Sequence, residues 1–198
     1  MLVEQQAELV RELEPDIIKV VRDQNGSHVV QKVIELVPEQ YIGFIMESFR
    51  GRVSQLASHA YGRLVVLCLL EHGTEKDKED LIAELHIAAN TLITDQYGYT
   101  VMQRVIEHGK LEDRSCIIAL VTSQLVMMSK HRVGSKLVEK CIEFGTTEEQ
   151  RRILEQLTAL GMDGNCPLSH ILQDKYGNYV IRSWTFPPPF SSFCEPRC

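Results

Sequence analysis

The sequence repeats one phrase five times, and this periodicity constrains the fold more than any other feature. The copies occupy residues 23–35, 61–71, 97–107, 133–143 and, in shortened form, 176–184. Each contains one glycine, and successive glycines are 36, 36, 36 and 43 residues apart: Gly26, Gly62, Gly98, Gly134 and Gly177. A fixed period of this length is typical of stacked helical units that bury their apolar faces against one another.

Each copy is predicted to form a helix with one apolar face and one outward face. With Ser27 at zero and about 100° per residue, four apolar residues fall between about 200° and 340°: Val29, Val30, Val33 and Ile34. The opposite arc carries Ser27, His28 and Gln31. Ser27 and Gln31 lie one above the other at i and i+4, while His28 points toward the neighbouring repeat. The pair could therefore contact one flat object, and the third residue could insert between two.

The rest of the chain is also predicted to be helical, giving about three helices per repeat. Residues 3–13 and 16–22 form helices divided at Pro15, and Pro38 opens a helix over 39–49. A short helix starts at Val53, and further helices span 78–92 and 112–128. The Gly, Asp, Asn and Pro content of 160–169 predicts a loop. Three consecutive prolines then end the pattern, so we expect residues 185–198 to be a disordered tail.

Composition points to a soluble intracellular protein, which we expect to be cytoplasmic and monomeric. No apolar run approaches the roughly 20 residues of a membrane span, and residues 1–21 do not resemble a secretory signal. The net charge of −6 argues against indiscriminate polyanion binding. Acids concentrate between the copies while the copies carry basic residues, so one face could be basic and the outside acidic.

The six cysteines show no zinc-ligand spacing. Cys68 and Cys141 fall on apolar arcs and are expected to be buried hydrophobes. We assign no metal, no disulfide and no cofactor.

The repeated phrases resemble the Pumilio-homology (PUF) RNA-binding repeats. The similarity covers residues 3–184, and the phrases NGSHVVQK, YGRLVVLCLLEHG, QYGYTVMQRVIEHG, VGSKLVEKCIEFG and KYGNYVIRSW resemble the fourth to eighth repeats of that family. The resemblance implies an α-solenoid of three-helix repeats, a partial crescent over 1–184 that binds single-stranded RNA on its concave face. It also implies recognition of UGUA-type elements in messenger 3′ untranslated regions, leading to translational repression or messenger decay.

The resemblance also implies roles for the outward triplets. Two residues per repeat would read a base edge: Ser27 and Gln31, Arg63 and Leu67, Tyr99 and Gln103, Ser135 and Glu139, Asn178 and Arg182. One residue per repeat would stack on a base face: His28, Leu64, Thr100, Lys136 and Tyr179. The second repeat departs from the family, which has Cys, Arg and Gln at the positions of Arg63, Leu64 and Leu67. The third has Tyr99 and Thr100 in place of Asn and Tyr, and the fifth has Arg182 in place of Gln.

Three other interpretations stay open. An armadillo- or HEAT-like solenoid would act as a protein-interaction scaffold, although it would need no recurring polar triplet. A degenerate PUF relative would keep the fold without tight RNA binding. An enzyme would need a nucleophile, a base and an oxyanion site in one cleft, and the scattered histidines show no such grouping. His72 and His108 recur one period apart at predicted helix ends, as dipole partners would. Protein partners, if present, are expected on the convex face or the 160–169 loop.

Overall fold

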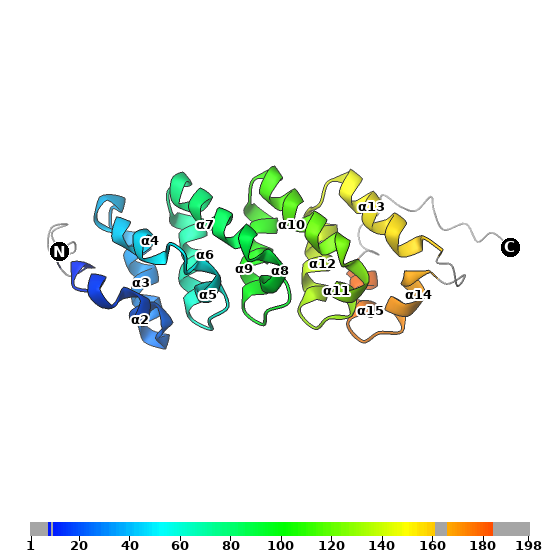
Figure 1. Cartoon of the computed structure of the whole chain (residues 1–198), viewed down its shortest axis with the longest axis horizontal. Helices are drawn as coiled ribbons and strands as arrows, with labels where there is room; N and C mark the ends of the chain where they lie inside the picture. The colour runs from blue at the N-terminus through cyan, green and yellow to red at the C-terminus, as the bar shows by residue number, and fades with distance from the viewer. Residues whose placement is uncertain (1–7, 9, 161–165, 184–198) are drawn as a thin grey trace. The chain divides into compact units, whose positions relative to one another are not determined.

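The computed structural model describes residues 8, 10–160 and 166–183, and every regular element among them is a helix (Figure 1). The predicted all-α fold is confirmed. The chain divides into two compact units, residues 1–117 and 118–198, with the boundary inside helix α10. A single repeat domain over 1–184 stays a prediction.

The first repeat of the first unit ends in a long helix. The 3₁₀ turn η1 (Glu14–Asp16) contains Pro15 and leads into α2 (Ile17–Arg22), followed by α3 (Gln24–Leu36). The helix predicted over 16–22 is therefore confirmed within one residue. Most of the helix predicted over 3–13 lies outside the described residues.

The second repeat comprises η2 (Glu39–Tyr41), α4 (Gly43–Phe49), α5 (Val53–Ala57) and α6 (Gly62–His72). The single helix predicted over 39–49 is wrong, because it divides at Ile42, whose φ of −114° and ψ of 2° are not helical. Gly51 has a φ of +71°, a left-handed conformation that ordinary side chains disfavour, and it turns the chain between α4 and α5.

The third repeat comprises α7 (Glu75–Ile87), α8 (Ala89–Leu92) and α9 (Gly98–His108), after which α10 (Leu111–Ser123) begins. The segment predicted over 78–92 starts three residues earlier because Thr74 and Asp77 form a capping box. It also divides at Ala88, whose φ and ψ of −96° and 4° interrupt the helix.

The second unit contains α11 (Leu125–Lys130), α12 (Gly134–Phe144), α13 (Thr147–Thr158), α14 (Pro167–Leu172) and α15 (Gly177–Ser183). The helix predicted over 112–128 divides at Gln124. The loop predicted over 160–169 is too long, because proline is favourable in the first turn of a helix and α14 begins at Pro167. Residues 161–165, Trp184 and the 185–198 tail lie outside the described residues.

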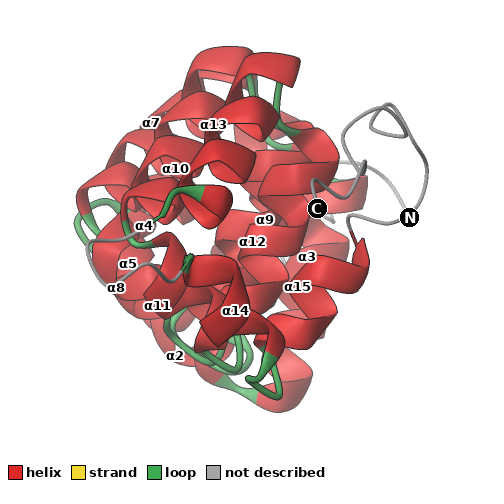
Figure 2. Ribbon diagram, turned by 90° about the vertical axis from the view of Figure 1, so that its right-hand side faces the viewer, coloured by secondary structure: helices red, strands yellow, loops and turns green. Residues whose placement is uncertain are grey.

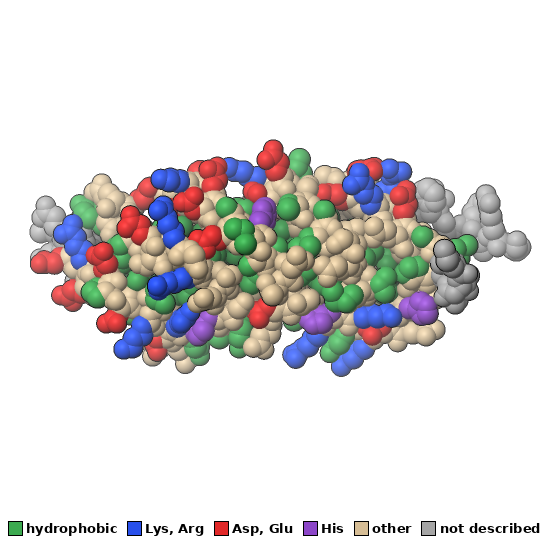
Figure 3. Space-filling view, viewed as in Figure 1, with side chains coloured by type: hydrophobic (Ala, Val, Ile, Leu, Met, Phe, Trp, Pro, Cys, Tyr) green, Lys and Arg blue, Asp and Glu red, His purple; other side chains and the backbone are tan. Residues whose placement is uncertain are grey.

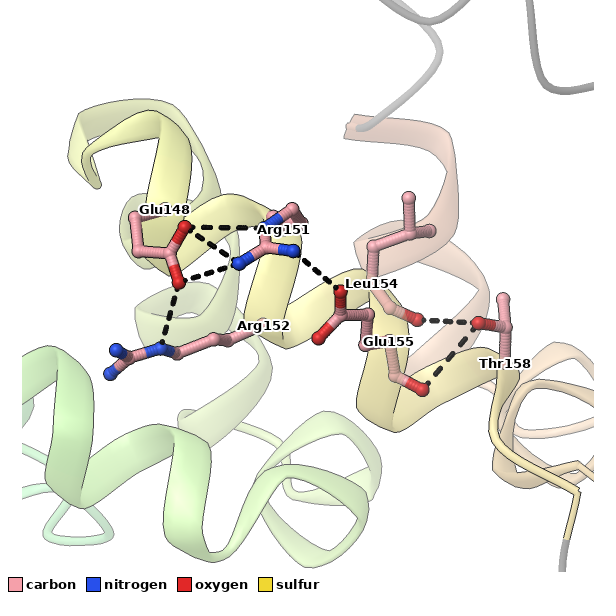
Figure 4. A network of polar contacts seen from close by, with 6 residues as sticks. All are labelled: Glu148, Arg151, Arg152, Leu154, Glu155 and Thr158. Carbon is pink, nitrogen blue, oxygen red and sulfur yellow. Dashed lines mark hydrogen bonds and ion pairs between the residues drawn. The ribbon is translucent and has the colours of Figure 1, made fainter.

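Helix α13 carries a network of exposed charges, drawn in Figure 4. Arg151 Nη2 lies 2.8 Å from Glu148 Oε1, Arg151 Nη1 lies 3.2 Å from Glu155 Oε1, and Arg152 Nε lies 3.4 Å from the same Glu148 oxygen. Spacings of three and four residues place these side chains on one helical face. Exposed pairs of this kind contribute little stability each, so α13 is held mainly by its buried residues, Ile153 and Leu157.

Within the first unit the helices form two layers. Figure 2 shows α4, α5, α7 and α8 on one side and α3 and α9 on the other. The layers enclose a core of large, fully buried side chains: Phe49, Ile45, Leu56, Leu81, Leu85, Leu92, Met102 and Ile106. The helices that carry the repeated phrase therefore lie in one layer and bury the apolar side of the phrase against the other.

The repeat glycines permit a close crossing of two helices. A Cβ atom on Gly62 would lie 2.9 Å from the carbonyl oxygen of Leu56, and one on Gly134 would lie 2.9 Å from that of Met128. In both cases the obstacle is the backbone of the preceding short helix, which cannot move aside as a flexible side chain can. The recurring glycine is thus explained by packing.

No helix in the described part of the chain is long and apolar enough to cross a membrane.

Candidate nucleic-acid interface

Each inner helix, as we call the five that carry the repeated phrase (α3, α6, α9, α12 and α15), starts with a side-chain acceptor placed three residues before the repeat glycine. Asp95 Oδ1 accepts hydrogen bonds from the backbone N–H groups of Tyr97 (2.9 Å) and Gly98 (2.7 Å). The acceptors alternate between carboxylate and imidazole along the chain: Asp23, His59, Asp95, His131 and Asp174. These bonds satisfy N–H groups that a helix start leaves unpaired.

Sequence reasoning missed this acceptor position. Its signal was available, because an Asp or His precedes every repeat glycine by three residues. At Asp174 the bonds from Gly177 and then Tyr176 favour the ionised form and hold the pKa of the carboxyl below its usual value. The capped start fixes the direction in which each triplet projects.

The inner helices lie side by side within each unit. In the first unit α3 packs against α6, and α6 packs against α9. In the second unit α12 packs against α15. The predicted triplets of neighbouring repeats are therefore brought next to one another, three in the first unit and two in the second.

The first edge position differs from the prediction in two repeats. Ser27 is fully buried and Ser135 is 3% exposed, so the expectation that both face outward is wrong. The Ser27 hydroxyl donates to the Gln24 carbonyl oxygen at 3.0 Å, inside its own helix. A serine side chain is short, and this hydroxyl stays beside the backbone of its own helix. Arg63, Tyr99 and Asn178, at the same position, are partly exposed.

The second edge position is more accessible. Gln31, Leu67, Gln103 and Glu139 are partly exposed, and Arg182 is exposed. Gln31 Nε2 donates to the Ser27 carbonyl oxygen at 3.1 Å, and Gln103 Nε2 donates to Glu107 Oε1 at 3.1 Å. Both amides are thus oriented by the protein before any ligand arrives.

The stacking position is exposed where the residue is long. His28, Lys136 and Tyr179 are exposed, and Tyr179 exposes 58% of its surface. Leu64 and Thr100 are partly exposed. Thr100 Oγ1 donates to the Tyr97 carbonyl oxygen at 2.7 Å, which turns its hydroxyl inward.

Arg63 has a partner that the sequence did not suggest. Its guanidinium carbon lies 5.5 Å from the ring centroid of Tyr97, the residue immediately before α9. This cation–π contact joins α6 to the next repeat. The buried Nε of Arg63 has no hydrogen-bond partner in the described part of the chain.

Glu139 is a partly buried carboxylate on α12. Burial raises its pKa, and the nearby charges of Lys136 and Lys140 act in the opposite direction. Lys140 Nζ forms its ion pair with Glu143, at 2.8 Å. Among the described residues no hydrogen bond reaches the Glu139 carboxylate. Its oxygens are therefore available to a donor from outside.

The predicted buried arc of α3 is only half correct. Val30 and Ile34 are buried, Val33 is partly exposed, and Val29 exposes 51% of its surface. The residues at the address of Val29 in the later copies are fully buried: Val65, Val101, Leu137 and Val180. Val65 and Val101 are covered because α6 and α9 each pack against a preceding inner helix. Val29 has no preceding inner helix in the described part of the chain.

The two cysteines assigned to the core behave as expected. Cys68 is 7% exposed and Cys141 is fully buried. Burial raises the pKa of the Cys68 thiol to about 11. His72 and His108 are the last residues of α6 and α9, as their spacing predicted.

Charges of both signs mix on the face drawn in Figure 3. The acids of α7 are partly paired: Lys110 Nζ lies 2.7 Å from Glu79, and Arg50 Nη2 lies 3.6 Å from Asp80. The acidic stretches between the copies are therefore partly neutralised by basic residues from neighbouring elements.

Comparison with known proteins identifies the repeat. The model of the NOP9-like PUF repeat domain matches residues 4–160, and that of the Pumilio-family RNA binding repeat matches residues 170–182. The chain is 37% identical over 82 residues to putative pumilio homolog 10 of Arabidopsis thaliana, covering 41% of this chain and 16% of that protein. It is 29% identical over 87 residues to Pumilio homology domain family member 4 of Saccharomyces cerevisiae, covering 44% and 10%.

Two solved structures extend the likeness to the fold. The Puf3 RNA binding domain, solved bound to a Cox17 RNA 3′ UTR recognition sequence, gives a TM-score of 0.86 at 33% identity over 93% of this chain and 57% of that one. PUF-8 in complex with PBE-RNA gives 0.85 at 31% identity over 91% and 53%. The chain thus spans about half the length of these solved chains and less than a fifth of the two curated relatives. Its periodic inner helices and these matches agree: the chain belongs to the PUF repeat family.

Proposed function

We propose that this chain binds single-stranded RNA through the outward residues of α3, α6, α9, α12 and α15. One observation carries the proposal. An edge-reading pair and a sideways residue recur at the same positions of the inner helices, and these helices lie side by side within each unit. An unpaired base offers a hydrogen-bonding edge and two flat faces, and such a triplet can address both. The Puf3 and PUF-8 structures, each solved with RNA, support it.

The biological role proposed with it is recognition of UGUA-type elements in messenger 3′ untranslated regions, followed by translational repression or decay. The protein would act in the cytoplasm as a monomer and would catalyse no reaction. Residues 1–184 would form one repeat domain and 185–198 a disordered tail. Protein partners would use the surface opposite the inner helices or the 160–169 loop, part of which lies outside the described residues.

Glu139 is the residue on which base selection rests most directly. An ionised carboxylate only accepts hydrogen bonds, and the Watson–Crick edge of guanine presents N–H donors to it. Adenine and uracil do not offer the same donors at that edge. Glu139 is partly exposed and lacks a hydrogen-bond partner among the described residues, which supports its availability. We therefore assign guanine to the repeat of Ser135 and Glu139, with Lys136 at the neighbouring face.

The first prediction concerns this guanine. Short RNAs containing UGUA should bind more tightly than the same RNAs with adenine, uracil or cytosine at the guanine position. A lost charge-assisted hydrogen bond costs about 1.5 to 3 kcal/mol, so the preference should be roughly tenfold to a hundredfold. Equilibrium binding to the four RNAs measures it, and Glu139→Gln should abolish the preference.

A matched control separates base reading from general charge effects. Glu143→Gln removes a carboxylate from the same helix that already pairs with Lys140, so it should leave the base preference unchanged. Because burial raises the pKa of Glu139, acidification should protonate it earlier than ordinary exposed glutamates and weaken the guanine preference. A wild-type protein with no preference, or a Glu139→Gln variant that retains it, would contradict the assignment.

One observation favours a second candidate, a PUF-like or armadillo/HEAT-like scaffold that binds protein. Leu67 places an apolar side chain at an edge position of α6, where a base edge would need a polar group, and Leu64 places a second one at the stacking position beside it. The same RNA titration decides between the candidates. Absence of binding to every RNA at micromolar protein would favour the scaffold.

A further inference from the structure

Three metal-ligating side chains meet where the ends of α3 and α6 lie together in the first unit. Glu35 belongs to the last turn of α3, and Cys68 and His72 lie one turn apart on α6. One ligand atom from each residue lies within 4.8 Å of the other two. We propose that Glu35, Cys68 and His72 form a binding site for a zinc ion.

The fold produces this cluster by two independent routes. Cys68 and His72 are at i and i+4, which places them on one face of α6. Glu35 is 33 residues earlier in the sequence and reaches them because α3 packs against α6. Sequence spacing alone could not show the third ligand, so the cluster is a product of tertiary packing.

The donor atoms suit zinc in kind. Zinc prefers thiolate sulfur, imidazole nitrogen and carboxylate oxygen in a tetrahedral arrangement. In such a site the donor atoms would be roughly 3.3 to 3.6 Å apart, given the usual zinc–ligand bond lengths. Glu35 and His72 are exposed, so their side chains can rotate to bring their donor atoms closer to the sulfur of the buried Cys68. Water would complete the fourth position.

Binding would replace an existing weak contact. Glu35 forms an ion pair with Lys32, whose side chain is 69% exposed. An exposed pair of this kind is weak, and a doubly charged ion competes well with a single ammonium group. The Glu35 carboxylate also has a second oxygen, which the ion pair with Lys32 does not use. On binding, the Cys68 sulfur exchanges its S–H bond for a bond to zinc, and the proton passes to solvent.

The other repeats show that the cysteine is what makes this position different. The address of Cys68 holds a basic residue in the three other full-length copies: Lys32, Arg104 and Lys140. At the next junction Glu71 and His108 recur at the addresses of Glu35 and His72, and both line one hollow together with Arg104. The junction of α6 and α9 thus has the same carboxylate and imidazole, but a guanidinium takes the place of the thiol. It serves as an internal control, because Arg is not a zinc ligand.

The second prediction tests the site with the full-length, reduced and metal-free protein. Cobalt(II) is the probe, since it occupies zinc sites and gives a near-ultraviolet charge-transfer band when bound to a thiolate. One equivalent of cobalt(II) should produce the band, and added zinc should displace the cobalt and remove the band. Cys68→Ser should remove the band. Glu35→Gln and His72→Ala should each weaken zinc binding by at least about tenfold, the lower end of the losses known for altered metal shells.

Matched variants decide whether the effect belongs to this cluster. Cys116→Ser removes an exposed cysteine, and His108→Ala removes the equivalent imidazole of the next repeat. Both should bind cobalt and zinc as the wild type does. The Glu35→Gln and His72→Ala variants alter exposed side chains and should fold normally, so the test does not depend on Cys68→Ser alone. No charge-transfer band in the wild type, or equal losses in the His72 and His108 variants, would overturn the proposal.

Discussion

At the scale of single residues, the repeat glycines and the acceptors three residues before them define where each inner helix begins. The acceptor holds the first free N–H groups, and the glycine lets the preceding short helix approach closely. His59 and His131 do in α6 and α12 what Asp23, Asp95 and Asp174 do in the other three inner helices. Chemically different side chains thus serve one structural purpose, which a search for identical letters overlooks.

The third prediction uses this packing. Gly62→Ala should destabilise the protein by about 1 to 3 kcal/mol, the usual cost of overpacking, because the new Cβ would lie 2.9 Å from the Leu56 carbonyl oxygen. Gly43→Ala is the matched control, since nothing lies within 4 Å of a Cβ at that helical position. It should stabilise by about 0.5 kcal/mol through the unfolded chain. Urea denaturation followed by circular dichroism measures both, and equal shifts in the same direction would contradict the packing argument.

At the scale of elements, stability depends on whether an inner helix has an inner helix before it. In a stack of repeats each unit contacts only its neighbours, so the energy lies in the interfaces between them. The address of Val29 shows this, because the same kind of residue is half exposed on α3 and fully buried on α6 and α9.

The fourth prediction compares two valines at that address. Val101→Ala should cost about 2 kcal/mol, from the lost burial of two methyl groups and the cavity they leave. Val29→Ala should cost less than about 1 kcal/mol, because 51% of Val29 is already exposed. Denaturation midpoints would establish the difference, provided that the dependence of the unfolding free energy on denaturant concentration is the same in both variants. Losses of the same size would mean that Val29 is covered in solution.

At the scale of the whole molecule, the charge pattern bears on how RNA would be held. The chain has a net charge of −6, and its predicted triplets contain only three basic residues: Arg63, Lys136 and Arg182. Binding that relied on phosphate contacts would need a larger basic surface. Affinity should therefore come mainly from base edges and stacking.

The fifth prediction follows from this count. Three cationic side chains brought against a single strand would release counterions and give a slope of log affinity against log salt of about −2. Lys136→Gln should reduce the magnitude of this slope by about 0.7, the contribution of one cation. Lys76→Gln, on helix α7 and outside the inner helices, should leave the slope unchanged. Titrations across a range of salt concentrations measure it, and a slope steeper than about −5 would indicate binding dominated by the backbone.

The sequence by itself determined the repeat, the inner helices and the family, because a 36-residue period and helical apolar spacing are properties of the chain alone. Element boundaries were less certain, since breaks at Ile42, Ala88 and Gln124 depend on local backbone angles that no residue type announces. The arc that carries each triplet could be predicted from helical periodicity, but the exposure expected of Ser27 and Ser135 was wrong. A helical wheel, however, gives direction without saying what covers it.

Only the tertiary structure decided which of those residues are accessible and which distant ones meet. Ser27 and Ser135 share their helical position with the partly exposed Arg63, Tyr99 and Asn178, and they are still buried. Val29 lies on an apolar arc and is still exposed, because no inner helix precedes it in the described part of the chain. Glu35 joins Cys68 and His72 through the packing of α3 on α6. Burial and long-range proximity are properties of pairs of elements, and the sequence of one element cannot specify them.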